Sequence, residues 1–213
     1  MRSACVLLVA ALALPAMAAA QDCLDCVLGI WDDPALTTNR GEIVPFEPKD
    51  LYVGMKLAGG ISDFAGVEFS VFGLDRDGLL LLGATPLGPK ALVWGTVPAP
   101  EDTTETSEGV GGVTAAWSTC LEGSVAIMKL VVYATADLSD HVLQVKRSYP
   151  TSNSSWRVPI LVRCDPPYYS IARVTGACYV LNASSPTGDC AAMQNNPTAV
   201  TLATWSGMKQ LYR

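Results

Sequence analysis

The chain has 213 residues, a net charge of −6 at pH 7 and 50% hydrophobic residues. Its acidic balance argues against nucleic acid as a partner, because binding to phosphates needs clustered basic side chains. The length suits one domain of the all-β or α/β kind.

Residues 1–20 have the pattern of a secretory signal peptide. Arg2 gives a basic start, an apolar run covers Ala4 to Leu14, and Ala18 to Ala20 offer small residues for cleavage. The run is too short to span a bilayer, which takes roughly 20 apolar residues. We therefore expect a secreted, periplasmic or cell-surface protein in which residues 21–213 form a single domain without a transmembrane segment.

Cysteine usage agrees with export. Cys5 would leave with the signal peptide, and an even number would remain: Cys23, Cys26, Cys120, Cys164, Cys178 and Cys190. In an oxidising compartment these are expected to pair as disulfides, with Cys178 joined to Cys190 across a turn-rich stretch. The Cys23-Leu-Asp-Cys26 sequence could instead be a redox-active dithiol or half of a zinc site. Both are less favoured, since no βαβ context surrounds the pair and no second closely spaced pair follows.

Apolar and polar residues alternate along most of the chain, which indicates half-buried strands. The clearest case is Asp50 to Leu57, where Leu51, Val53 and Met55 alternate with other residues. Further strands are expected at 67–71, 79–82, 91–97, 113–118, 125–135, 142–149 and 158–162. Short strands at this spacing predict an all-β, antiparallel β-sandwich. Pro159 predicts that the last of these strands lies at a sheet edge.

The strand at 125–135 has one uniformly apolar face, which we expect to face the core: Ala126, Met128, Leu130, Val132 and Ala134. Its other face joins Ile127, Val131 and Tyr133 around Lys129. A short C-terminal helix capped by Thr204 would place Trp205, Met208, Leu211 and Tyr212 on one side. We expect this helix to cover the second face of the strand, the alternative being an open contact surface.

A longer pattern runs through residues 50 to 135. The strand Leu51 to Leu57 is followed by Ile61-Ser-Asp-Phe-Ala-Gly66-Val-Glu-Phe69-Ser-Val71, and then by Asp75 before a leucine-rich strand. This order resembles the opening of cohesin-like domains and related carbohydrate-binding sandwiches of secreted bacterial proteins. The resemblance implies a jelly-roll or cohesin-like fold; it does not imply dockerin binding.

The sequence offers few groups for catalysis or metal binding. His141 is the only histidine, and no Gly-x-Ser-x-Gly sequence accompanies it, so we expect a surface side chain. The sequence Asp75-Arg-Asp77-Gly78 resembles the first half of a calcium loop. It lacks the third ligand and the distal glutamate, so a hairpin turn is favoured and no metal or cofactor is expected.

These observations predict an exported, non-catalytic binding or assembly module of the cell envelope or extracellular space. Its ligand would be a protein or a carbohydrate at the cell surface, held on aromatic side chains drawn from Trp94, Trp117, Trp156, Tyr168 and Tyr169. Two alternatives stay open. One is an exported hydrolase using a carboxylate pair, either Asp32-Asp33 or Asp75 with Asp77. The other is a disulfide oxidoreductase acting through Cys23 and Cys26.

Overall fold

The computed structural model describes residues 22–75, 77–98, 111–148, 156, 158–164 and 170–184. These residues form strands and the turns between them, with no helix in the ranges described. The strands are β1 (Cys23–Trp31), β2 (Arg40–Gly41), β3 (Pro48–Lys56), β4 (Asp63–Phe72), β5 (Leu79–Pro86), β6 (Leu92–Thr96), β7 (Gly112–Glu122), β8 (Val125–Ala134), β9 (His141–Lys146), β10 (Ile160–Arg163), β11 (Ile171–Gly176) and β12 (Cys178–Leu181).

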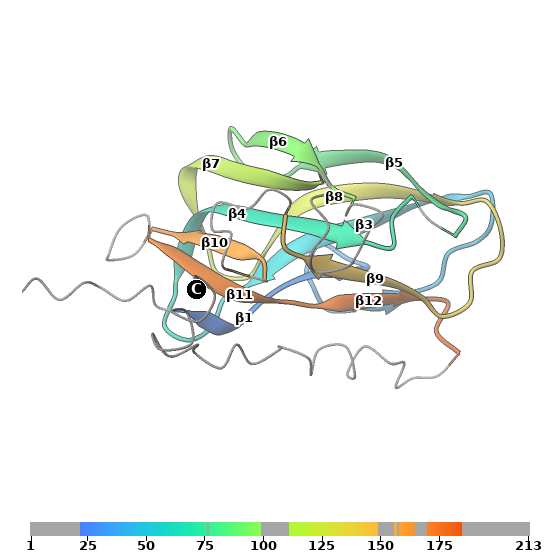
Figure 1. Cartoon of the computed structure of the whole chain (residues 1–213), viewed down its shortest axis with the longest axis horizontal. Helices are drawn as coiled ribbons and strands as arrows, with labels where there is room; N and C mark the ends of the chain where they lie inside the picture. The colour runs from blue at the N-terminus through green and yellow to red at the C-terminus, as the bar shows by residue number, and fades with distance from the viewer. Residues whose placement is uncertain are drawn as a thin grey trace, which may run out of the picture.

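Two groups of hydrogen-bonded strands make up the β-sandwich (Figure 1). In one group β1, β3, β8 and β5 are neighbours in that order and antiparallel throughout. In the other, β6, β7 and β4 are neighbours, and β4 also pairs with β10 near its start and with β9 at its end. β11 pairs with β10 on one side and with β1 on the other. β12 pairs with β9 on one side and with the short β2 on the other. The all-β sandwich is confirmed.

The core follows the alternation of the sequence. On β8, Met128, Leu130, Val132 and Ala134 are buried, so the core face is confirmed at these four positions, while Ala126 is half-buried. Ile127 is also buried; it is the extra residue of a bulge opposite β3. Leu51, Val53 and Met55 of β3 are buried in the same core. Each such side chain contributes about 1.5–3 kcal/mol relative to its exposed state.

The strand predicted at 158–162 is not an edge strand. β10 begins at Ile160 and pairs with β4 on one side and with β11 on the other. Pro159 precedes the strand, and its carbonyl oxygen accepts the N–H of Val174 at 3.1 Å. Because Pro159 lies outside the β10 ladder, its missing N–H interrupts no pairing. The edge assignment was therefore wrong.

Four short or irregular elements were missed by the sequence patterns, namely β1, β2, β11 and β12. All of β12 is buried, so its sequence shows no alternation. β1 pairs in parallel with β11, and β12 pairs in parallel with β2, which adds two parallel contacts to an otherwise antiparallel sandwich. The expected signal peptide and the expected C-terminal helix fall on 1–20 and 204–213, outside the described residues. In the part of the chain that is described, no helix has the length and apolar character needed to cross a membrane.

Candidate functional site

Two large apolar side chains of β6 point into solvent. Leu92 is 53% exposed and Trp94 is 60% exposed. They are two positions apart and so lie on the same face of the strand, whereas Val93 between them packs against the core. Val93 therefore contributes to the packing of the fold, whereas Leu92 and Trp94 do not.

The neighbours of Leu92 and Trp94 on β7 are small. Leu92 pairs with Ala116 and Trp94 pairs with Thr114, and both β7 residues are half-buried. Among the described strands β6 pairs only with β7, so it forms an edge of its layer (Figure 1). We call the surface made by Leu92, Trp94, Thr114 and Ala116 the β6 face.

Of the aromatic residues expected to form a binding platform, Trp117 is not on the surface. It is 6% exposed, its indole N–H donates to the carbonyl oxygen of Leu87 at 2.8 Å, and its ring meets Phe64 edge-on at 5.8 Å. The signal was present in the sequence, because Trp117 is in phase with Val113 and Ala115, which are both buried. Trp117 is thus a core residue.

Of the remaining aromatic candidates besides Trp94, one is half-buried and two lie outside the described residues. Trp156 is half-buried, and the guanidinium of Arg173 lies 6.0 Å from its ring centre. Tyr168 and Tyr169 lie outside the described residues. Leu92, which the sequence did not single out, joins Trp94 instead.

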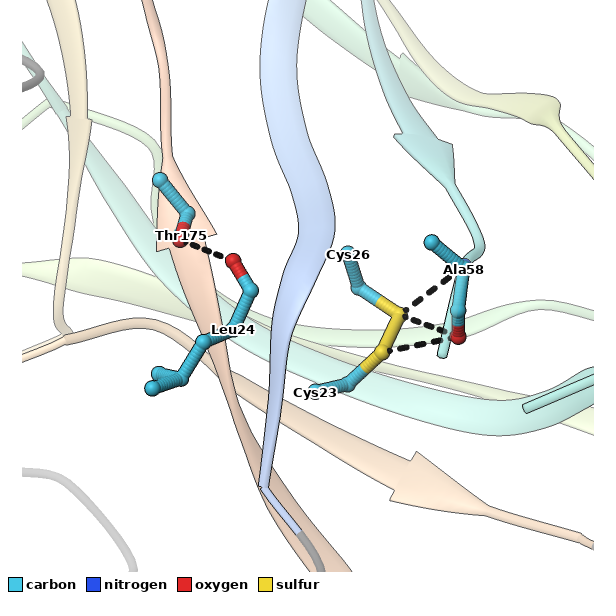
Figure 2. Close-up of a disulfide and its surroundings, with 5 residues drawn as sticks. All are labelled: Cys23, Leu24, Cys26, Ala58 and Thr175. Carbon is cyan, nitrogen blue, oxygen red and sulfur yellow. Dashed lines mark hydrogen bonds between the residues drawn. A yellow bond between two sulfur atoms is a disulfide. The ribbon is translucent and has the colours of Figure 1, made fainter. Parts of the chain in front are cut away.

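Cys23 and Cys26 form a disulfide that closes a bulge in β1 (Figure 2). Cys23 pairs with Val174 of β11 and Val27 with the next residue, Thr175, so residues 24–26 loop out of the ladder. On one side of this loop the hydroxyl of Thr175 donates to the carbonyl oxygen of Leu24 at 2.6 Å. On the other side the N–H of Ala58 donates to Cys26 Sγ at 3.3 Å.

Burial of this disulfide favours a structural role. Cys23 is 2% exposed and Cys26 is fully buried. Thiol–disulfide exchange needs a sulfur that an attacking thiolate can reach, and redox-active cysteines are accordingly partly exposed. The arrangement therefore gives no support to a redox function for the pair.

A second disulfide joins Cys120 to Cys164, with Cα atoms 6.2 Å apart. Cys120 lies near the end of β7 and Cys164 directly follows β10, so the bridge links the two neighbours of β4 where that strand begins. Cys178 is disulfide-bonded as well. Its expected partner, Cys190, lies outside the described residues.

Asp75 and Asp77 lie in the turn between β4 and β5. Asp75 Oδ1 accepts the N–H of Leu81 at 2.7 Å, so this carboxylate helps to close the turn. β4 and β5 belong to different groups of strands and do not pair with each other, so the turn is not a hairpin and that expectation was wrong. Both residues have positive φ values, 54° and 49°, a conformation that aspartate tolerates in turns. No group of three or more His, Cys, Asp or Glu side chains suited to a metal occurs within the described ranges.

The adjacent carboxylates of Asp32 and Asp33 have separate partners. Asp32 Oδ1 accepts the hydroxyl of Tyr179 at 2.6 Å and lies 2.6 Å from Lys49 Nζ. Burial, followed by the hydrogen bond to Asp32, raises the pKa of Tyr179. Asp33 accepts the Thr37 hydroxyl at 2.7 Å, and this contact lowers the pKa of Asp33. Asp32 thus joins segments that are far apart in the chain, and Asp33 closes a local turn.

His141 lies at the start of β9. Its Nε2 is 2.8 Å from the carbonyl oxygen of Gly73, and the side chain is half-buried rather than fully exposed. This contact ties β9 to the end of β4. The only histidine of the chain is therefore engaged with the backbone of the sandwich.

A second apolar surface lies on the outer side of β3, β8 and β5. Tyr133 of β8 pairs with Leu80 of β5, and the ring of Phe46 meets Tyr133 at 6.5 Å between centroids. Phe46 is 67% exposed and Leu80 is 41% exposed, while Val131 and Tyr133 are half-buried. We call Phe46, Leu80, Val131 and Tyr133 the β8 strip. Lys129 follows on the same face, paired with Asp50 of β3 at 3.2 Å.

No protein-family model matches the chain. No curated protein matches it either. Solved structures similar to it include a cohesin module from a Clostridium perfringens family 33 glycoside hydrolase, with 10% identity, a TM-score of 0.44, and 74% of this chain and 98% of that chain covered. A non-cellulosomal cohesin from the archaeon Archaeoglobus fulgidus matches with 7% identity and a TM-score of 0.41. The match covers 73% of this chain and 90% of the cohesin. A type I cohesin from Pseudobacteroides cellulosolvens matches with 9% identity and a TM-score of 0.43. The match covers 76% of this chain and 95% of the cohesin. All three of these structures are cohesin modules, the family whose opening strands residues 50–135 resemble.

Proposed function

We propose that this protein is an exported, non-catalytic binding module, that its ligand is another protein, and that the β6 face is the contact surface. The observation that carries the proposal is the exposure of Leu92 and Trp94 side by side on an edge strand. Tryptophan is enriched among the residues that dominate binding energy at protein interfaces. A solvent-exposed tryptophan with no role in packing is therefore a candidate anchor.

The neighbours of Trp94 favour a protein over a carbohydrate. Trp94 is flanked on its own strand by Leu92 and across the ladder by Thr114, with Ala116 beside it. A sugar ring carries hydroxyls around its edge, and a site for it combines a stacking ring with well-placed polar side chains. The β6 face is mainly apolar, with one hydroxyl, and suits an apolar protein surface better.

Export and the absence of catalysis rest on other observations. Disulfides at Cys23–Cys26 and Cys120–Cys164 are stable in the oxidising compartments that exported proteins enter. The carboxylates of Asp32, Asp33 and Asp75 are held in contacts that close turns or tie strands together. These groups support the sandwich, and binding by a preformed surface is the function we assign to it.

The test compares binding by the purified mature protein and by single variants. The wild-type protein, Trp94→Ser and Leu80→Ser are immobilised and exposed to the envelope and secreted proteins of the native source, and the same three proteins are applied to a glycan array. Leu80 is the matched control because it is an exposed apolar residue on the other group of strands. We expect one captured protein whose affinity falls by about tenfold or more with Trp94→Ser and is unchanged with Leu80→Ser. Equal capture by Trp94→Ser and the wild type would overturn the β6 face as the binding surface. Binding to a glycan that Trp94→Ser abolishes would replace the protein ligand by a carbohydrate.

A further inference from the structure

We propose that Asp75, by accepting the N–H of Leu81, protects the open edge of β5 and keeps two copies of this protein from joining through that strand. β5 belongs to the group of β1, β3 and β8, whereas the β6 face lies in the other group. The inference is therefore independent of the proposed function. It gives a role to a carboxylate whose sequence context resembles part of a calcium loop.

β5 is an apolar edge strand. Among the described strands it pairs only with β8, so one side of its backbone faces away from the sheet. Its sequence, Leu-Leu-Leu-Leu-Gly-Ala-Thr-Pro, contains no charged residue. Leu80 is 41% exposed and Leu82 is 58% exposed. A strand of this kind tends to pair with another chain unless the fold prevents it.

One hydrogen bond establishes which backbone groups of β5 face the open side. The carbonyl oxygen of Gly78 accepts the N–H of Thr135 at 2.8 Å, so Gly78 points toward the chain that forms β8. In an antiparallel ladder this direction alternates from one residue to the next. Leu80 therefore points its N–H and C=O toward β8, whereas Leu79 and Leu81 point theirs outward.

The side chain of Asp75 occupies one of these outward groups. Its Oδ1 accepts the N–H of Leu81 at 2.7 Å, which agrees with the outward direction of that N–H. The exposed carboxylate consequently lies along the open edge of β5. It uses a donor that an added strand would need, and it stands where such a strand would lie.

The rest of the β5 edge is protected by other means. The register with β8 shifts after Leu81, so Leu82 is the extra residue of a bulge. Leu87 donates its N–H to a carbonyl oxygen of β8 at 2.8 Å, which places its neighbour Pro86 in the outward set. Proline has no N–H to offer there, and both bulges and prolines interrupt edge pairing. Residues 79–81 are thus the stretch that Asp75 protects.

A second copy of this chain is the partner that the edge fits. Two β5 strands can lie antiparallel about a two-fold axis, so that outward groups of Leu79 and Leu81 in one copy meet those in the other. The exposed side chains of Leu80 and Leu82 would add apolar contacts beside the joint. With Asp75 in place, the Leu81 donor is already used, and pairing would first have to break that bond.

The test is sedimentation velocity of the full mature protein over a range of concentrations. Asp75→Gly removes the side chain, and glycine accepts the φ of 54° at this position. Asp77→Gly is the matched control, because Asp77 is an exposed aspartate of the same turn with φ 49°. Asp75→Asn keeps an acceptor for the Leu81 N–H. We expect only Asp75→Gly to shift from monomer to dimer as its concentration rises.

Amide exchange measured by NMR checks the contact itself. At a concentration where Asp75→Gly is still a monomer, the Leu81 amide should exchange about tenfold faster than in the wild type. The amide of Leu130, in the core of the sandwich, should keep its rate, which shows that the variant is folded. An unchanged rate at Leu81 would mean that Asp75 does not hold this N–H in solution, and the proposal would fail.

A double variant locates the contact between copies. Adding Leu82→Lys to Asp75→Gly should restore the monomer, since a lysine on an edge strand opposes pairing. A dimer as strong as that of Asp75→Gly alone would place the interface elsewhere and overturn the proposal.

Three results of the sedimentation experiment would also overturn it. Asp75→Gly could associate no more than the wild type, so that the carboxylate does not keep copies apart. Equal association of Asp77→Gly would assign the effect to the loss of any charge from the turn. Equal association of Asp75→Asn would make the charge of Asp75, and not its bond to Leu81, the cause.

Discussion

The side chain of Asn182 pairs with the backbone of Ile43 in both directions. Its Oδ1 accepts the Ile43 N–H at 2.8 Å, and its Nδ2 donates to the Ile43 carbonyl oxygen at 3.1 Å. Leu181, the residue before it, pairs with Gly41 in the parallel β12–β2 ladder. The carboxamide thus extends this ladder by one rung beyond the last backbone pair. Nδ2 also donates to the carbonyl oxygen of Leu138 at 2.6 Å, so one side chain holds two loops together.

Replacing Asn182 should therefore destabilise the fold by more than the replacement of a single polar residue usually does. Asn182→Ala removes three hydrogen bonds, and the backbone there has φ 49°, which alanine adopts poorly. We expect a loss of about 2–4 kcal/mol in the free energy of unfolding, measured by urea denaturation. Asn182→Gly, which tolerates the positive φ, should lose less. If Asn182→Ala lowers the free energy of unfolding by less than about 0.5 kcal/mol, water replaces the hydrogen bonds of the carboxamide.

The two faces of β8 should respond very differently to truncation. Leu130 is fully buried, whereas Lys129 is half-buried and its ammonium group is paired with Asp50 on the surface. Leu130→Ala should cost about 2–5 kcal/mol because it leaves a cavity. Lys129→Ala should cost less than about 1 kcal/mol because surface ion pairs contribute little. Similar effects for the two variants in denaturant melts would contradict the register of β8.

The sequence predicts those strands in which apolar and polar residues alternate, and it misses the others. Strands with one buried and one exposed face, such as β3 and β8, are recognisable because Leu51 and Leu130 each sit in a run of period two. β12 is buried on both faces, so Tyr179 and Leu181 give no such signal. β1 is irregular because its disulfide loop interrupts the ladder after Cys23.

The candidate site was predicted only in part for a related reason. Alternation on β6 separates Leu92 and Trp94 from Val93, but it does not say which set faces the core. Trp117 is in phase with Val113 and Ala115, which indicates that it faces the core, whereas the exposure of Trp94 follows only from the position of β6 at the edge of its layer. The contact between Phe46 and Tyr133 joins residues far apart in the chain, so no local pattern reveals the β8 strip.

The two described disulfides should differ in their contribution to stability. Cys23 and Cys26 are separated by 3 positions, whereas Cys120 and Cys164 are separated by 44. Loop-closure entropy gives about 2 kcal/mol for the first and about 4 kcal/mol for the second. Thermal or urea unfolding of the double alanine variants should therefore rank Cys120→Ala/Cys164→Ala as the less stable. Alkylation of the folded wild type without reductant should label no cysteine. The reverse ranking would mean that the bulge in β1 depends on its disulfide far more than loop length implies.

Acid should weaken the contact between Asp22 and Arg173. The side chains form a two-point hydrogen-bonded ion pair between the start of β1 and β11, and the hydrogen bond from Arg173 lowers the pKa of Asp22. A carboxylate with a lowered pKa contributes stability above its unfolded pKa, about 3.9, and this stability is lost as the pH falls through the folded value.

The Tm difference between the wild type and Asp22→Asn should therefore shrink as the pH is lowered from about 6 to about 2. Asp25→Asn, an exposed carboxylate in the neighbouring bulge, controls for the loss of one negative charge. A Tm difference that stays constant over this range would show that the ionised pair adds nothing to stability.

Trp94 and Trp117 make a matched pair that separates binding from folding. Trp117 is 6% exposed and its indole N–H is hydrogen-bonded to Leu87, so Trp117→Ala should cost about 3–5 kcal/mol. Trp94 is 60% exposed, and its removal leaves no cavity, so Trp94→Ser should change the free energy of unfolding by less than about 0.5 kcal/mol. Urea denaturation measures both. A Trp94→Ser variant that is as stable as the wild type and no longer captures the ligand would show that this residue acts in recognition. A marked loss of stability in Trp94→Ser would instead mean that the ring packs against the sandwich in solution, and the β6 face could not then be an open binding surface.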